Sequence, residues 1–282
     1  MNFQMTTTNK DHDRHKNVRS MLELMLPLRV ADAGSVLEQP VHSVLSPDLG
    51  LSSCLLYYDV SCPNTCVDSL VMQTCVSAAS CREQFSRDPS QEQSSSPTDP
   101  ASVMDDRRRV LVIMGGQAWT QLPCSWHLMP SLSPDIMKTI SFIYPKSSKD
   151  LVKYLNKASQ KDYPDTIIVS EMHKLVEKDH DSSIKRSSSR QFGKNFAKLT
   201  AVLTDFSSFY AKKKSRGCNL FIFSQLDPMI ESVLSQKFNL WFYECWKLEK
   251  EVLRCKSSPT NQCIKFFLRG EQYYLETLEY SK

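Results

Sequence analysis

The stretch from Ser61 to Ser69 is the part of the chain whose position and residue types bear most directly on chemistry. It lies between an apolar, strand-like run and a helix-like pattern, where a phosphate-binding P-loop would sit. A P-loop needs two glycines that let the backbone wrap phosphates, then a lysine and a hydroxyl residue. In this chain those four places hold Ser61, Cys66, Val67 and Asp68. Because Asp68 would repel a phosphate, the stretch is either a degenerate nucleotide loop or an ordinary strand-to-helix loop.

Two more polar positions follow apolar, strand-like runs. The run Thr166–Val169 ends where P-loop proteins place the acid that serves magnesium, but Ser170 stands there instead. The next residue, Glu171, either substitutes through a water or begins the following helix, where an acid suits the helix dipole. Gln225 ends the run from Asn219, and a polar residue at a strand tip is placed to sense a ligand.

The segment from Lys185 to Arg216 is far more basic than the chain as a whole, whose net charge is +4. It holds nine basic residues and one acid, Asp205. Lysines and arginines at this density favour phosphate contacts through counterion release, and nearby aromatic residues would allow base stacking. The alternative is a solvated surface helix with a basic exit loop. The candidate DNA-binding residues are Lys185, Arg186, Arg190, Lys194, Lys198, Lys212, Lys213, Lys214 and Arg216.

The ten cysteines are scattered, and several lie within apolar runs. This distribution favours reduced, buried thiols in a cytosolic or nuclear protein. A zinc site built from Cys62, Cys66, Cys75 and Cys81 would match no common spacing, so we expect no metal site. No run reaches the roughly 18 consecutive apolar residues that a membrane span needs, so we expect no membrane contact.

The elements that must position these residues alternate along the chain. Strands are expected at residues 54–60, 110–114, 140–144, 166–169 and 219–224, and helices at 69–84, 147–159 and 192–211. Three more strands, at 240–247, 262–268 and 272–278, end the chain, the last two joined by a tight turn at Arg269–Glu271. This order predicts an α/β protein with a mostly parallel sheet, helices on both faces and an antiparallel C-terminal edge.

The domain organisation follows from composition. Residues 1–50 are mostly polar and are expected to form a disordered arm. Residues 51–282 are expected to form one domain, interrupted at about 86–106 by a disordered insertion rich in serine and proline.

Several stretches, taken in order, resemble a known family. They are Ile140–Leu151, Pro164–Val176, Gly217–Gln225, the C-terminal strands of residues 241–280 and the loop Ser61–Met72, which aligns with the family's P-loop without a gap. The chain resembles the RecA-like partner of the SWIM-type zinc-finger protein in the vertebrate Shu complex, a relative of the recombinase paralogues. The resemblance implies a RecA-like P-loop NTPase core that uses ATP and Mg.

The resemblance also implies a function. The family acts in the nucleus, in homologous recombination repair of DNA double-strand breaks, as a DNA-stimulated ATPase. Its implied partners are the SWIM-type zinc-finger protein, the recombinase and its paralogues, and single-stranded DNA. This sequence departs from the family at the P-loop and the magnesium-binding acid, so ATP hydrolysis is not expected here.

Two rival hypotheses stay open. One is a protein-interaction scaffold with a degenerate P-loop and no DNA binding. The other is an active ATPase that draws its lysine from outside the loop. Because Trp241, Phe242 and Trp246 lie on one expected strand, we also expect them to form apolar surface that a partner covers.

Overall fold

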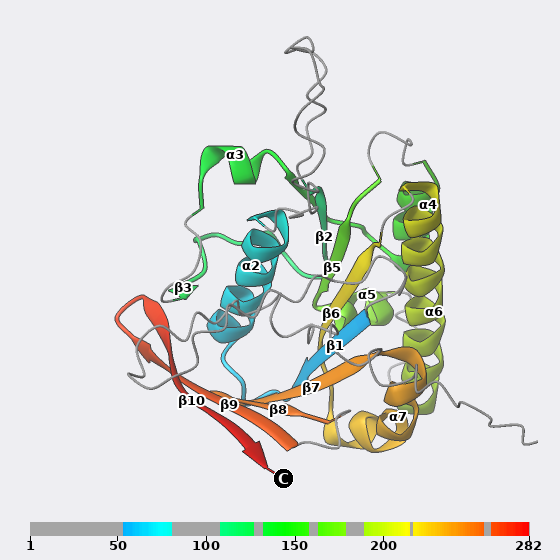
Figure 1. The fold of residues 1–282 in the computed structure, drawn as a ribbon. Helices are drawn as coiled ribbons and strands as arrows, with labels where there is room; N and C mark the ends of the chain where they lie inside the picture. The colour runs from blue at the N-terminus through cyan, green and yellow to red at the C-terminus, as the bar shows by residue number, and fades with distance from the viewer. Residues whose placement is uncertain are drawn as a thin grey trace, which may run out of the picture.

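The computed structural model describes residues 53–80, 108–126, 132–157, 163–178, 189–214, 217–256 and 261–281. They build one mixed sheet with the strand order β3-β10-β9-β8-β7-β1-β6-β5-β2-β4 (Figure 1). The strands are β1 Ser53–Tyr58, β2 Val110–Met114, β3 Ser125–Trp126, β4 Ile140–Ile143, β5 Thr166–Ser170, β6 Asn219–Gln225, β7 Glu244–Glu249, β8 Val252–Cys255, β9 Asn261–Arg269 and β10 Gln272–Ser281. The helices are α2 Asn64–Ser80, α3 Pro134–Met137, α4 Ser148–Lys157, α5 Met172–Lys178, α6 Ser189–Lys214 and α7 Pro228–Trp241.

Strand β1 lies at the centre of the sheet. All six of its residues are buried, and it pairs in parallel with β6 on one side and β7 on the other. Leu55, for example, faces Ile222 of β6 and Cys245 of β7. A strand that is covered on both faces must be apolar throughout, which explains the unbroken run from Cys54 to Tyr58.

The two faces of the sheet carry separate apolar cores. Leu56 belongs to the core that packs under α2, with Leu70 and Val71 from that helix. Its neighbour Leu55 points the opposite way, into a core that includes residues of α4, α5, α6 and α7. Figure 1 shows α2 on one side of the sheet and these four helices on the other. The predicted fold class, a mostly parallel sheet with helices on both faces, is confirmed.

The predicted antiparallel edge is also confirmed. Strands β7, β8, β9 and β10 pair antiparallel in chain order. The turn between β9 and β10 contains Gly270, whose φ of +64° lies in the left-handed region that favours glycine. Beyond β10, the two residues of β3 pair with it in parallel.

The sequence prediction missed α7 and was wrong about residues 240–243. A strand was expected from Leu240 to Lys247, but α7 continues to Trp241 and β7 begins at Glu244. Asp227 caps α7 by accepting a hydrogen bond from the backbone of Met229, and Pro228 occupies the first turn. This Asp-Pro start signal was overlooked because the aromatic run from Trp241 has the composition of a strand.

The expected partner surface was misplaced as well. Trp246 is fully buried and Phe242 is 4% exposed, so both belong to the core of the protein itself. The exposed apolar side chains of this region lie on α7 instead. The proposed N-terminal arm and the insertion at about 86–106 fall outside the described residues.

Helix α6 spans 26 residues between β5 and β6 and is tied to the sheet at its C-terminal end. There Lys214 Nζ lies 2.7 Å from Asp165 Oδ1, and the backbone N–H of Arg109 donates to Asp165 Oδ2 at 2.8 Å. Asp165 is 4% exposed. Its carboxylate therefore depends on these two partners in place of water.

Replacing Lys214 with alanine should destabilise the protein by about 1–3 kcal/mol, because a buried carboxylate loses its counter-ion. Urea unfolding at neutral pH measures this difference. Lys212→Ala is the matched control, since Lys212 is exposed on the same turn and should change stability by less than about 0.5 kcal/mol. Equal stabilities of the two variants would show that the ion pair has no structural role.

Candidate functional site

The loop between β1 and α2 lies at the carboxyl edge of the parallel strands, where α/β sheets bind ligands. Tyr58 ends β1, and its carbonyl accepts a hydrogen bond from the backbone N–H of Leu226 at 2.9 Å. This bond sets the first residue after β6 beside the end of β1. The loop that the sequence placed at the P-loop position therefore lies at the carboxyl edge of the parallel strands.

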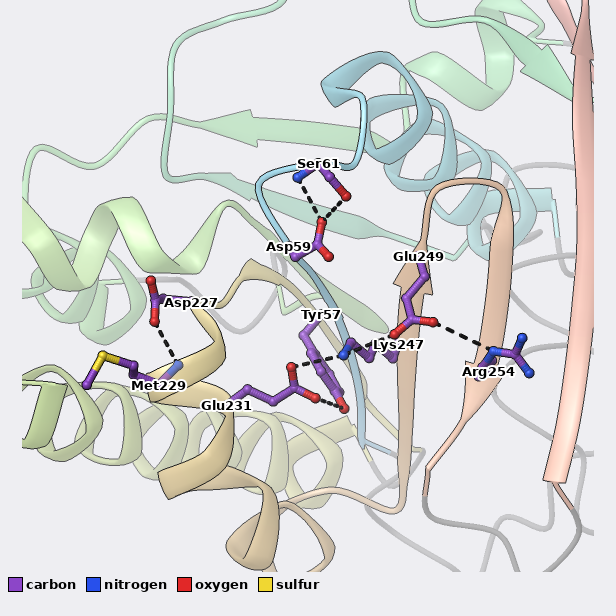
Figure 2. Close-up of polar contacts among 9 residues, drawn as sticks. All are labelled: Tyr57, Asp59, Ser61, Asp227, Met229, Glu231, Lys247, Glu249 and Arg254. Atoms are coloured by element: carbon purple, nitrogen blue, oxygen red, sulfur yellow. Dashed lines mark hydrogen bonds and ion pairs between the residues drawn. The ribbon is translucent and has the colours of Figure 1, made fainter.

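The polar groups of this loop are held by its own aspartate. Asp59 Oδ1 accepts hydrogen bonds from the backbone N–H of Ser61 at 2.8 Å and from the Ser61 hydroxyl at 2.5 Å (Figure 2). The backbone N–H of Cys62 bonds the Asp59 carbonyl at 3.2 Å. The hydrogen bond from Ser61 holds the pKa of Asp59 below its ordinary value. The Asp59 carboxylate thus accepts hydrogen bonds from N–H and O–H donors of the kind that a P-loop offers to phosphate.

Helix α2 begins at Asn64, five residues earlier than predicted. Cys66 and Val67 consequently lie in its first turn, where they are 1% and 2% exposed and pack into the core under α2. At the position where a P-loop has its lysine, this chain therefore has Val67, whose side chain belongs to the apolar core. Asp68 is half-buried and Ser61 is exposed.

The carboxyl end of β5 forms the second part of the site. Ser170 stands at the place of the magnesium-binding acid, and its hydroxyl is buried without a hydrogen-bond partner. Glu171 follows with a φ of +53° and forms an ion pair with Lys174. Burial raises the pKa of Asp68, the charge of Glu171 raises it further, and Lys174 opposes the rise. The charge of Lys174 thus interacts with two carboxylates of the same chain, Glu171 and Asp68.

Two glycines at the end of β2, which the sequence reasoning did not assign to the site, make room for Glu171. A Cβ on Gly116 would lie 1.7 Å from Glu171 Oε2, and one on Gly115 would lie 2.2 Å from the Glu171 carbonyl oxygen. Lys178 Nζ donates to the Gly115 carbonyl at 2.8 Å. The sequence did contain a signal for these two glycines, because they form its one Gly-Gly pair.

His173, on α5, connects the ends of β1 and β6. Its Nδ1 accepts a hydrogen bond from the backbone N–H of Gln225 at 3.1 Å, and its ring meets Tyr58 edge-on at 6.4 Å between centroids. Burial lowers the pKa of His173 to about 4, so the ring is neutral near pH 7. Gln225 is half-buried and pairs with Tyr58 at the end of β1. His173 was missed because its neighbours come from distant parts of the chain.

A polar network on the α7 side of the sheet adjoins the loop (Figure 2). Lys247 Nζ lies 3.1 Å from Glu231 Oε2 and 3.0 Å from Glu249 Oε1, and the Tyr57 hydroxyl donates to Glu231 at 3.2 Å. Burial lowers the pKa of Lys247, but its hydrogen bonds to Glu249 and Glu231 outweigh this and raise it. Lys247 is thus held by two carboxylates and is poorly placed to replace the missing lysine of the loop.

The predicted basic segment divides into separate surfaces. Arg190, Lys194 and Lys198 are exposed at four-residue spacing on the first half of α6. Lys212 and Lys213 are exposed about 21 Å beyond Lys198 along the helix, at 1.5 Å per residue. Lys185, Arg186 and Arg216 fall outside the described residues.

The expectation that the whole basic segment lies on the ligand edge was wrong. Helix α6 runs back across the sheet before β6, so Lys212 and Lys213 lie at the opposite, amino-terminal edge. Lys214 marks this edge through its bond to Asp165, the residue before β5. Only the stripe Arg190, Lys194 and Lys198 lies on the half of α6 that approaches the carboxyl edge.

These residues do not fit ATP with Mg. The donors of Ser61 bind Asp59, a core valine occupies the position of the lysine, and Ser170 occupies the position of the acid. Within the described ranges, no three His, Cys, Asp or Glu side chains gather in a way that could hold a metal ion. Within the same ranges, no helix has the length and apolar character of a membrane span.

Comparisons with known proteins give a structural likeness only. Neither a protein-family model nor a curated protein matches the sequence. Among solved structures, the chain is similar to a KaiC-like protein from the hyperthermophilic archaeon Pyrococcus horikoshii, with a TM-score of 0.44 and 7% identity. That match covers 80% of this chain and 89% of the archaeal one. A likeness at this level identifies no function.

His173 should make the stability of the protein depend on pH. Its pKa is about 4 in the folded state against an ordinary 6.5, so between these values the unfolded chain binds the extra proton. Stability should therefore fall as the pH drops from 6.5 towards 4. His173→Gln keeps an acceptor for Gln225 but does not titrate. Between pH 7 and pH 5 the unmodified protein should lose about 2 kcal/mol more than this variant in urea unfolding. If the stability of the two proteins falls equally with pH, the low pKa of His173 is wrong.

Proposed function

We propose that this protein is a non-hydrolysing, RecA-like accessory factor in homologous recombination repair of DNA double-strand breaks. In this proposal it acts in the nucleus, binds a SWIM-type zinc-finger protein, and supports filaments of the recombinase and its paralogues on single-stranded DNA. The protein contributes binding surfaces, and ATP turnover belongs to its partners.

One observation carries the proposal: in the loop at the P-loop position, the N–H and O–H donors of Ser61 bind the loop's own carboxylate, Asp59. Strand β1 lies between β7 and β6, with β5 and β2 beyond, an order that suits a RecA-like core. Within that frame Asp59 takes the Ser61 donors, and Lys174 and Lys247 serve acids of the same chain. A fold that keeps this architecture while closing the loop fits a role in binding better than a role in hydrolysis.

The exposed stripe on α6 supports contact with DNA. Arg190, Lys194 and Lys198 follow one another along one side of the helix, and exposed cations at this spacing can each neutralise a phosphate. The fully buried face of α6 includes Phe196 and Leu203. The three basic side chains of the stripe therefore take no part in the packing of α6 against the core.

The outer face of α7 supports contact with a protein partner. Met229, Val233 and Leu240 are 69%, 49% and 80% exposed and lie within a narrow angular range of the helix. Tyr243, just past the helix, is 55% exposed. The inner face of α7 is already packed through Leu234 and Phe238, so this second apolar face is surplus to the fold.

The purified protein should show no ATP turnover above a mock preparation, with or without single-stranded DNA. Millimolar ATP with Mg should also leave the melting temperature unchanged, because binding to the folded state would raise it. The mock preparation, from cells carrying an empty vector, controls for contaminating ATPases. DNA-stimulated hydrolysis that co-purifies with the protein over successive chromatography columns would contradict this part of the proposal.

Capture of the tagged protein from nuclear extract should recover the SWIM-type zinc-finger protein, identified by mass spectrometry. Changing both Val233 and Leu240 to serine should reduce that recovery at least several-fold, because a partner would lose the centre of its apolar contact. The matched control changes Ser235 and Asn239, exposed polar residues on another side of the same helix, to alanine. Failure to recover the zinc-finger protein with the unmodified chain would refute the partnership, and equal recovery by both variants would refute this surface.

A further inference from the structure

The antiparallel extension of the sheet presents a face that differs from both apolar cores. On β9, Ile264 and Phe266 are buried toward the α2 side, where Trp126 and Tyr273 meet Phe266 at 5.0 and 5.8 Å between ring centroids. The alternate residues of β9 point to the other side of the sheet. There Phe267 is 38% exposed and Arg269 is exposed. Figure 1 shows this hairpin at the far end of the sheet from α6.

An aromatic pair lies at the centre of this open face. Phe267 of β9 stands directly opposite Tyr274 of β10, and their rings are stacked, with centroids 5.5 Å apart and planes inclined by 14°. Phe267 is 38% exposed, and Tyr274 is half-buried with its hydroxyl donating to Gln272 at 3.1 Å, so both rings are only partly covered. Two aromatic rings on neighbouring strands of an open sheet face form the platform on which several nucleic-acid-binding domains stack bases.

Two basic residues lie beside Phe267, and a third, Arg254, lies further along the same face, opposite Cys263 of β9. Lys265 and Arg269 flank Phe267 at two-residue spacing on β9, so all three share a face. On β8, Arg254 is exposed, and its contact with Glu249 is long, at 3.7 Å. Among the side chains that the structure describes on β8, β9 and β10, Arg254, Lys265 and Arg269 are positive and Glu276 is negative.

We propose that the face built by Arg254, Lys265, Phe267, Arg269 and Tyr274 binds single-stranded nucleic acid, with bases stacked on the aromatic pair and phosphates on the basic residues. This inference rests on the proposed role at single-stranded DNA and adds a second contact, separate from the stripe on α6. Stacking suits unpaired bases, because the bases of a duplex already cover one another's faces. A protein interface also has a polar rim, so the excess of positive over negative side chains is what favours a nucleic acid as the ligand.

The test measures binding of the full-length protein to fluorescent 30-nucleotide strands of oligo-dT and oligo-U by anisotropy. The double variant Phe267→Leu with Tyr274→Leu keeps an apolar pair but removes the rings, and should weaken binding about 5- to 30-fold if one base stacks. Changing Arg254 and Arg269 to glutamine should lower the log–log salt slope by about 1.4, at about 0.7 per phosphate contact. The matched controls, Tyr144→Leu and Lys237→Gln, alter exposed residues elsewhere and should bind normally.

The outcomes separate this inference from the proposed function. If the hairpin variants bind normally while Arg190, Lys194 and Lys198 changed together to glutamine weaken binding, the hairpin site is wrong and the DNA role stands. If the unmodified protein binds no single strand even at low salt, both are wrong. Should a hairpin variant misfold, ultraviolet cross-linking of the unmodified protein decides, because the linked peptides must contain Phe267 or Tyr274. Comparison of oligo-dT with oligo-U shows whether the ligand is DNA, RNA or either.

Discussion

The complete burial of β1 is the constraint on which the rest of this structure depends. A central parallel strand with neighbours on both sides has no solvent-facing side, so both of its faces must be covered. Residues of even number, such as Leu56, require one apolar layer, and residues of odd number, such as Leu55, require another. The position of the following loop is a consequence, because the chain can leave β1 only at the carboxyl edge.

The candidate site shows what can replace a bound anion in such a fold. A loop with free N–H groups at this edge would attract phosphate, and these groups would be costly to leave without partners. Asp59 solves the problem within the chain. The same logic applies to charge: the acids near the end of β5 and on α7 are balanced by Lys174 and Lys247. The Ser61 donors that could meet a phosphate are therefore already bonded within the chain.

Much of the fold could be predicted because the parallel strands are short apolar runs separated by helical patterns. The buried run Thr166–Val169 is an example, since few structures other than an inner strand accommodate it. The start of α2 was missed because its Asn64 and Thr65 resemble loop residues. The place of Gln225 at a strand tip could be read from the sequence, whereas the positions of His173 and Lys174 could not. Their importance depends on contacts with β1, β6 and Asp68, which no local pattern in one sequence encodes.

The outer edge of the sheet has a consequence for the behaviour of the protein in concentrated solution. Strand β10 is ten residues long, yet in the part of the chain described only Gln272 and Tyr273 are covered on their outer side, by β3. An uncovered strand invites another chain to add to it, and stacks of such additions are insoluble. The register of β10 is broken between Leu275 and Thr277, and the exposed Glu276 lies at this break. The bulge and its charge act as a guard against edge-to-edge aggregation.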